Sequence, residues 1–189
     1  MVAPVDICNL ALQKLGEAPI TSLDESTPIA RQCAAAYEPM RDRELRAHPW
    51  SFALKRVTLA ADLTAPDFGP TASFTLPADF LRLHPDHEYE EESDWTVEGR
   101  KLLSSRAGDA LTLRYIYRVE DTTEFDPLFV DALAARIAWQ LCEIVTQSNT
   151  KKADARADYQ SVIREARAVN AIEKRSAEPP TDDWILVRR

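Results

Sequence analysis

The feature that most constrains this chain is a change of hydrophobic period, which runs from helical to alternating and back to helical. Apolar residues recur at helical spacing up to His48 and again from Asp126, whereas they alternate with polar residues in parts of the segment 50–119. A helical period gives a helix one apolar face, and a period of two gives a strand one apolar face. The expected order of elements is therefore two helices, a sheet and two further helices.

Prolines and capping residues mark where the helices begin. Thr27-Pro28 and Asp126-Pro127 each place a capping residue before a proline, and Pro4 suits the first turn of the first helix. Gly16 is suited to end that helix, because glycine readily adopts the left-handed conformation found at helix C-termini. We predict helices over residues 4–16, 28–48, 127–147 and 151–173.

The second helix contains one proline and is followed by another. Pro39 lacks an amide donor and clashes with the preceding turn, so we expect a kink or a break there. Pro49 disfavours the helical conformation at His48, which should end the helix. We interpret His48, Pro49 and Trp50 as a structural hinge, at which Trp50 anchors the sheet onto the helices. A catalytic His48 is disfavoured, because the chain carries no Gly-x-Ser-x-Gly or other nucleophile signature.

The middle of the chain predicts antiparallel strands. Apolar residues alternate over 111–119, which predicts a half-buried strand with Ile116 on its polar side. The stretch WTVEGRKLL predicts a hairpin that turns at Glu98-Gly99. Residues 61–73 and 84–94 are predicted loops, the second of which is very acidic.

Together these elements predict an α+β fold, mainly α, in which a four-helix bundle carries an inserted antiparallel β region and an extended C-terminal tail. The β region covers about residues 50–119, within a domain of residues 1–175, and the tail covers residues 176–189. Among the apolar positions that we expect to face the core are Ile144 and Val169.

Charge and glycine content exclude several classes of function. The net charge of −8 disfavours a free-standing DNA-binding protein, because phosphates are bound by positive surface. Only 4 glycines leave little room for phosphate-binding loops. The basic residues are 17 Arg and 6 Lys, and Arg favours assembly because it forms forked pairs with carboxylates. No segment approaches the ~20 apolar residues of a membrane span, so we expect a soluble protein that is made in a reducing cytoplasm and contacts no membrane.

The cysteines and histidines do not form a recognisable site. Cys8, Cys33 and Cys142 fall in apolar helical segments, so we interpret them as buried structural residues. We interpret His84 and His87 as surface loop residues, since no cysteine or third histidine nearby completes a tetrahedral metal site. We therefore predict no catalytic residue, no metal and no cofactor.

Two charged segments are less specific. The acidic run over 88–94 lacks the glycine turn and spaced oxygen ligands of a calcium loop, so we interpret it as a solvated loop. The basic residues of 151–175 suit a solvated helix face, and a phosphate-contacting surface is the alternative.

The C-terminal segment is the most informative part for function. Trp184 is followed directly by Ile185, Leu186 and Val187, after the stiff dipeptide Pro179-Pro180. A large apolar side chain gains ~1.5–3 kcal/mol on burial, so this cluster is costly to leave in water. We expect the tail to dock on another protein as an extended segment, and packing against its own bundle is the alternative.

Six stretches resemble a known family when they are taken in order. They are NLALQKLGEAPITSLDE, AYEPMRDRELRAHPWSFALKR, LPADFLRL, WTVEGRKLL, FDPLFVDALAARIAWQL and EARAVNAIEKR with the closing DDWILVRR. In this register the chain resembles the head-to-tail adaptors, or connectors, of tailed bacteriophages, of the tail tubular protein A type. The resemblance extends over nearly the whole chain.

The resemblance implies a structural protein of the virion that sits at the head-to-tail interface and is not an enzyme. Such adaptors form a ring, commonly a dodecamer, below the portal protein. The ring continues the DNA channel and attaches a tail nozzle or tail tube protein, and DNA passes through it without sequence-specific binding. The residues implied to dock on the portal are Asp183, Trp184, Ile185, Leu186, Val187, Arg188 and Arg189. Trp184 is the expected buried anchor.

Three other functions compete with the adaptor. A head- or tail-completion protein of a long-tailed phage or phage-like particle would use the same bundle with a different partner. A small hydrolase or nuclease is a more remote alternative, because acids and histidines are present without a signature. A cytoplasmic regulatory module would form a small oligomer and would not associate with particles.

Deleting residues 177–189 is expected to leave the melting temperature nearly unchanged, because a tail that docks elsewhere contributes little to its own fold. Calorimetry on the full and shortened chains measures this difference. A large loss of stability would show that the tail packs on its own bundle.

Overall fold

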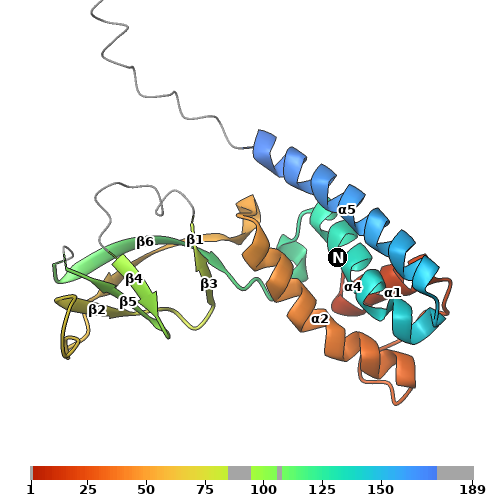
Figure 1. The fold of residues 1–189 in the computed structure, drawn as a ribbon, viewed down its shortest axis with the longest axis horizontal. Coiled ribbons are helices and arrows are strands. Elements are labelled where there is room, and N and C mark those ends of the chain that lie inside the picture. The colour runs from red at the N-terminus through yellow and green to blue at the C-terminus, as the bar shows by residue number, and fades with distance from the viewer. Residues whose placement is uncertain (1, 85–94, 106–107, 174–189) are drawn as a thin grey trace, which may run out of the picture.

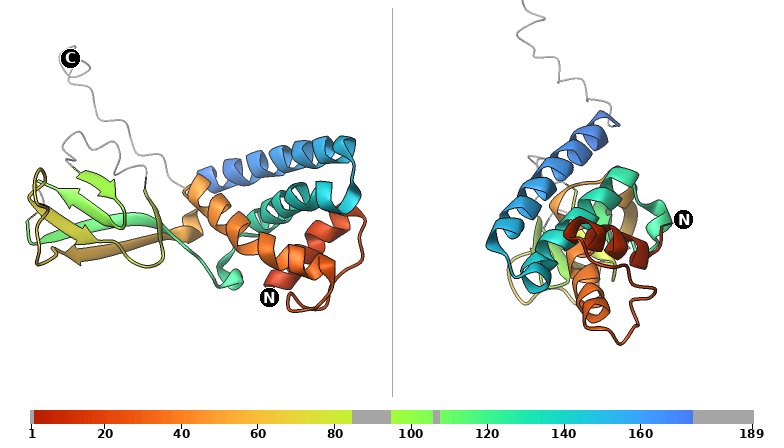
Figure 2. Two further views of the ribbon diagram at one scale, coloured as in Figure 1. Left: turned by 60° about the horizontal axis from the view of Figure 1, so that its bottom comes forward. Right: turned by 90° about the vertical axis from the view of Figure 1, so that its right-hand side faces the viewer.

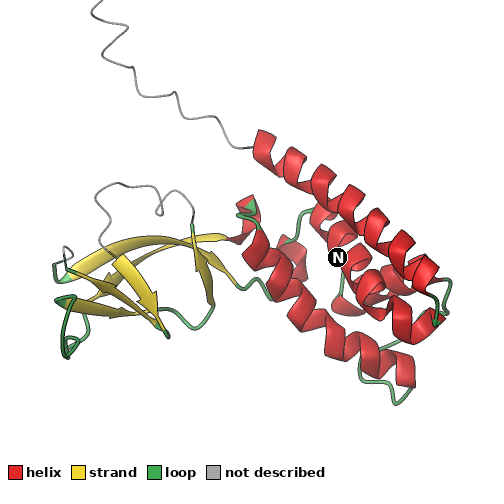
Figure 3. Cartoon of the chain, in the orientation of Figure 1, coloured by secondary structure: helices red, strands yellow, loops and turns green. Residues whose placement is uncertain are grey.

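The computed structural model describes residues 2–84, 95–105 and 108–173. The molecule is elongated, with the helices of the described chain at one end and the strands at the other (Figure 1). Figure 3 shows that helices and strands are segregated in space, although the strands lie between helices in the sequence. The predicted class, α+β and mainly α, is confirmed.

The helices follow the predicted capping signals. In residues 2–84, 95–105 and 108–173 they are α1 (Pro4–Leu15), α2 (Pro28–Ala47), α4 (Pro127–Thr146) and α5 (Asn149–Ile172). Thr27 and Asp126 each accept hydrogen bonds from backbone N–H groups in the first turn of their helix. Gly16 ends α1 in the left-handed conformation, with a φ of 80°. These bounds confirm the predicted helices to within two residues at each end.

Helix α2 is continuous through Pro39, so the expected break at this residue is wrong, and a kink there stays a prediction. Both Pro39 and Ala35, the residue whose carbonyl loses its helical partner, lie on the exposed side of the helix. Water can bond that carbonyl, which lowers the cost of the proline. The predicted end of the helix is confirmed, because His48 has extended backbone angles, with φ −145° and ψ 142°.

Helix α4 is the central helix of the bundle. It contacts α1, α2 and α5, and its buried face is almost continuous. Two predicted core positions nevertheless lie at the surface, because Ile144 is 57% exposed and Val169 is 39% exposed. On α5 the residue next to Val169, Asn170, is buried instead. No helix among the described residues has both the length and the apolar composition needed to cross a membrane.

In the described part of the chain the strands form two antiparallel three-stranded sheets with the orders β1-β6-β3 and β2-β5-β4. Their bounds are β1 (Leu54–Ala60), β2 (Ala72–Thr75), β3 (Phe80–Leu83), β4 (Trp95–Glu98), β5 (Lys101–Ser104) and β6 (Ala110–Tyr117). The predicted hairpin is formed by β4 and β5, and its turn is Gly99-Arg100, one residue later than expected. Gly99 has a φ of 58°, a conformation that favours glycine. Short 3-10 turns at Ser51–Ala53 and Thr122–Glu124 connect the sheets to the helices.

The sheets enclose an apolar core that is separate from the core of the helices. It consists of Phe74, Leu76, Leu83, Leu102, Leu113 and Tyr115. Strand β6 contributes to both cores, since Tyr115 faces the sheet core and the next residue, Ile116, is fully buried in the helical core. The prediction that Ile116 lies on a polar face is therefore wrong. The alternation of buried and exposed residues fails at this end of β6, because the helical core covers the face of the strand that was expected to be exposed.

Replacing the cap of α4, Asp126→Ala, is expected to lower the free energy of unfolding by about 1 kcal/mol, because two backbone N–H groups lose their acceptor. Urea denaturation measures the change. Asp131→Ala, at an exposed position of the same helix that caps nothing, is the control and should change stability by less than ~0.5 kcal/mol. Equal effects of the two substitutions would contradict the capping role.

Candidate functional site

The predicted portal-docking residues lie outside the described residues. They are Asp183, Trp184, Ile185, Leu186, Val187, Arg188 and Arg189. They follow α5 in the chain, and the described chain ends at Glu173, one residue after that helix. The second predicted site, the segment from His48 to Trp50, is fully described and lies where the helices meet the sheets (Figure 2).

Trp50 is the buried centre of this junction. The residue is 1% exposed, and its indole N–H donates to the carbonyl oxygen of Glu44 at 3.0 Å. Its ring packs edge-on against Phe129 of α4, with 5.1 Å between centroids, and against His48, with 4.7 Å between centroids. A buried indole whose N–H is bonded has both its apolar body and its polar group satisfied. Trp50 therefore attaches the end of α2 to α4.

Asn170 attaches α5 to the same junction. Its side-chain oxygen accepts hydrogen bonds from the backbone N–H and the hydroxyl of Ser51, at 2.8 and 2.9 Å. Its amide nitrogen lies 3.0 Å from Nε2 of His48 and donates to the Pro49 carbonyl at 3.4 Å. Three helices thus hold the segment that leads into β1. Movement of the sheets relative to the helices about His48, Pro49 and Trp50, as expected of a hinge, stays a prediction.

A buried polar network joins α2, α4 and α5. The hydroxyl of Tyr159 donates to the carboxylate of Glu44 at 2.9 Å, and Nε of Arg136 lies 3.6 Å from the same carboxylate. The Arg136 guanidinium also lies over the ring of Trp139, 4.3 Å from its centroid. Burial and the nearby Glu44 carboxylate raise the pKa of Tyr159 to about 12, so its hydroxyl keeps the proton that it donates. The network fixes which faces of the three helices meet, because an unpaired buried charge is costly.

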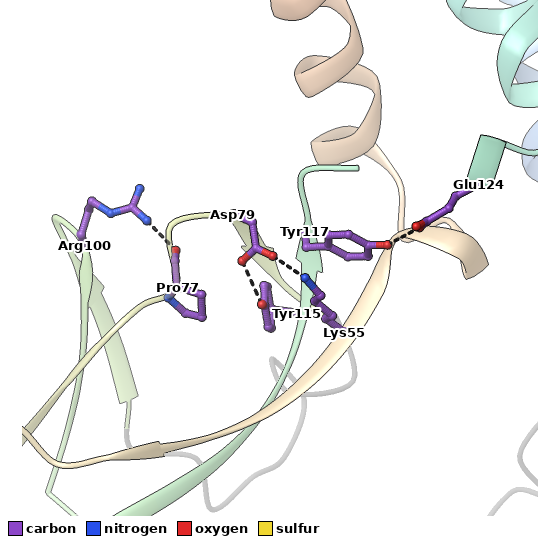
Figure 4. Close-up of polar contacts among 7 residues, drawn as sticks. All are labelled: Lys55, Pro77, Asp79, Arg100, Tyr115, Tyr117 and Glu124. Atoms are coloured by element: carbon purple, nitrogen blue, oxygen red, sulfur yellow. Dashed lines mark hydrogen bonds and ion pairs between the residues drawn. The ribbon is translucent and has the colours of Figure 1, made fainter. Parts of the chain in front are cut away.

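A second polar cluster joins the strands close to the helices (Figure 4). Asp79, just before β3, accepts hydrogen bonds from Lys55 of β1 at 2.7 Å and from Tyr115 of β6 at 2.9 Å. Tyr117 donates to Glu124 at 2.6 Å, which connects β6 to the turn before α4. Burial raises the pKa of Asp79, but the bonds from Lys55 and Tyr115 outweigh it and hold that pKa below its ordinary value. The cluster ties the loop before β3 to the sheet.

The chemistry of these clusters is that of structural contacts. Within 2–84, 95–105 and 108–173, no group of three or more His, Cys, Asp or Glu side chains is arranged to hold a metal ion. Cys8, Cys33 and Cys142 are buried free thiols, as predicted. The hydrogen bond with Cys33, together with burial, raises the pKa of the Cys8 thiol and keeps it from being a nucleophile.

His84 is buried, so its predicted surface location is wrong. The residue is 3% exposed, and its backbone N–H donates to the carbonyl of Arg114 at 3.0 Å. Pairing with β6 therefore continues one residue past the end of β3, and the side chain is covered. His87 and the acidic run of 88–94 lie outside the described residues.

Sequence reasoning missed the polar residues that hold the junction. Arg136 lies inside an apolar helical run, and Glu44 lies one residue before the buried Leu45. A charged residue inside an apolar helical face is a usable signal, because such a residue is rarely buried without a partner. Asn170 gives no comparable signal. Its partners, His48, Pro49 and Ser51, precede the β region in the sequence, whereas Asn170 follows it.

Comparison with known protein families supplies a match. The model of a family described as tail tubular protein matches residues 5–127. The matched segment runs from α1 through both sheets to the first residue of α4, and it covers more than half of the 189 residues. No curated protein matches the chain.

Removing the amide that holds the junction, Asn170→Ala, is expected to lower the free energy of unfolding by about 1–3 kcal/mol, because the Ser51 N–H loses its acceptor in a part-buried site. Urea denaturation measures the loss. The control is Val169→Ala at the neighbouring exposed position, which should have a much smaller effect. If both variants are equally stable, the Asn170 contacts do not hold the junction.

Acid should weaken the sheet region through Asp79. The folded pKa of this carboxyl lies below its ordinary value of 3.8, so the ionised group stabilises the folded state above that pH. This stabilisation is lost as the pH falls from 3.8 through the folded pKa. Thermal melts between neutral and acid pH should show a shallower acid limb for Asp79→Asn than for the native chain. Asp67→Asn, at an exposed residue without an ion pair among the described residues, should leave the acid limb unchanged.

Proposed function

Because the chain belongs to the tail tubular protein family, a structural component of phage tails, we propose that it is a head-to-tail adaptor. In this role copies of the chain form a ring below the portal protein. The ring continues the DNA channel and carries the tail nozzle or tail tube protein on its other side. A head- or tail-completion protein is the alternative within the same class of virion components.

The observation that carries the proposal is the division of the subunit into two ends. The helical end and the sheet end each have a separate apolar core, and they lie at opposite ends of the long axis (Figures 1 and 2). An adaptor must offer different surfaces to two different neighbours, and this subunit has two. The junction at Trp50, held from α2, α4 and α5, keeps the two ends in a defined relation.

The charge of the chain supports the passage of DNA. With a net charge of −8, a ring of such subunits is acidic overall. An acidic channel repels phosphates and lets DNA slide without being held. This agrees with a component that conducts DNA and does not read its sequence.

The tail, residues 176–189, is the proposed portal-docking element. It follows α5, whose last turn lies beside the end of α2, where the helices meet the sheets (Figure 1), so the tail would reach the portal from the middle of the subunit. Trp184 is the proposed buried anchor, and Arg188 and Arg189 are the proposed charge contacts. The large apolar side chains of this segment would be buried only on docking.

Light scattering on the purified chain, alone and mixed with the portal protein of the same particle, tests the proposal. We expect the chain to join the portal as a ring, and to fail to join when residues 177–189 are deleted. Trp184→Ala should weaken the association while leaving the melting temperature unchanged. Arg175→Ala, on the domain side of the two prolines, is the matched control and should bind normally.

A chain that ignores the portal would overturn the adaptor role. If such a chain binds a tail tube protein instead, the completion role takes its place. The melting temperature separates both outcomes from misfolding of the shortened chain.

A further inference from the structure

The loop between β1 and β2 exposes two large apolar side chains. Leu63 is 107% exposed and Phe68 is 88% exposed. Burying side chains of this size gains ~1.5–3 kcal/mol each, so their joint exposure at one loop favours an intermolecular contact. We call residues 63–68 the apolar loop.

The apolar loop stands on a hydrogen-bonded base. The backbone N–H of Asp62 donates to the Ser73 carbonyl at 2.8 Å. The hydroxyls of Ser73 and Thr75 donate to the Asp62 carboxylate, each at 2.9 Å, and Lys101 pairs with it at 3.0 Å. A base held in this way presents the loop at low cost in conformational entropy when the loop binds.

A groove of about 330 Å³ lies elsewhere on the β region. Its apolar lining includes Phe80, Leu81 and Val97, and its basic lining consists of Arg46, Arg82 and Arg100. We call it the arginine-rimmed groove. Its mixture of aromatic, aliphatic and guanidinium groups is typical of a protein-binding site.

The arginines of this groove lack carboxylate partners among the described residues. Arg46 donates to the Leu81 carbonyl, Arg82 to the carbonyls of Leu83 and Arg46, and Arg100 to the Pro77 carbonyl (Figure 4). Each guanidinium therefore has positive charge that no ion pair within the described chain neutralises. On a chain of net charge −8, this is a local site for an acidic partner.

The apolar loop has the complementary chemistry. Asp67, next to Phe68, is exposed and makes no ion pair with a described residue. The loop thus offers one carboxylate between two apolar side chains, and the groove offers arginines around an apolar floor. Arg and carboxylate groups form strong, forked hydrogen bonds when they are desolvated together.

The two surfaces cannot meet within one molecule. The apolar loop lies at the tip of the β region farthest from the helices (Figures 1 and 2), whereas the lining of the groove includes Arg46 of α2. Two different surfaces that bind each other between copies make a heterologous contact, which closes into a ring when the rotation allows.

We propose that the apolar loop of one copy docks in the arginine-rimmed groove of the next copy, with Phe68 on the apolar lining and Asp67 paired with Arg82 or Arg100. This inference rests on the proposed ring, and it names the residues that hold neighbouring subunits together. The occupant of the groove is therefore a second copy of this chain.

Disulfide trapping tests the contact directly. Phe68→Cys and Val97→Cys chains are prepared separately, mixed at high concentration and oxidised gently. A cross-linked dimer is expected in the mixture and in neither chain alone, because only the mixture places a cysteine in the loop of one copy opposite a cysteine in the groove of another. The native cysteines do not interfere, since all three are buried. Glu120→Cys, at an exposed position away from both surfaces, replaces Val97→Cys in the control and should give no dimer.

A charge exchange tests the specificity of the contact. Asp67→Arg and Arg82→Asp are each expected to lower the dissociation temperature or the extent of the portal-bound ring, and the two changes together should restore it. Glu120→Arg is the matched control and should assemble as the native chain does. Absence of the cross-link, or normal assembly of Asp67→Arg and Phe68→Ser, would overturn the proposal.

These outcomes are separable from failure of the proposed function, because the disulfide test uses no portal protein. A native chain that ignores the portal overturns the adaptor role, whatever the cross-link shows. If no cross-link forms and Phe68→Ser weakens binding to a nozzle or tube protein, the loop belongs to that partner and the contact between copies is wrong.

Discussion

The burial of Trp50 couples the two ends of the molecule. Its indole N–H is bonded to the end of α2, its ring packs on Phe129 of α4, and the residues beside it are bonded by Asn170 of α5. The chain enters β1 four residues later, so the position of the sheets is set by a contact inside the helical core. An aromatic side chain buries a large area and has a fixed shape, which suits a joint that must define direction.

The polar network beneath this joint constrains the helices in a different way. Apolar faces such as that of α4 tolerate small rotations, because burial depends on area and not on direction. The polar network in the same interface, formed by Glu44, Arg136 and Tyr159, does not tolerate such rotations. A rotated helix would move a polar partner away and leave a buried charge uncompensated. The bundle therefore obtains its stability from apolar area and its register from a few directional contacts. Defined register is what a subunit needs if many copies must present identical surfaces.

Strand β6 shows how the two cores are kept separate and yet connected. Leu113 and Tyr115 belong to the sheet core, and Ile116 belongs to the helical core. The Asp79 cluster closes the sheet side of this boundary, where Lys55 and Tyr115 converge on one carboxylate. In the proposed ring, forces from the portal side and the tail side would meet at this boundary. A boundary built from packed aromatic rings and hydrogen-bonded strands transmits such forces with little deformation.

The sequence by itself determined the class of fold, the order of the elements and the ends of the helices, because these depend on local signals. Capping residues, prolines and hydrophobic period act within a few residues, and the helix bounds follow them closely. The tertiary structure alone decided that α2 continues through Pro39, that Ile116 and His84 are buried, and that Asn170 replaces Val169 in the core. Each of these outcomes depends on which residues from distant parts of the sequence pack against the position, and a local sequence pattern does not give that information. The same reason applies to the arginine-rimmed groove, since its lining comes from α2, β3 and the β4–β5 hairpin, which meet only in the folded chain.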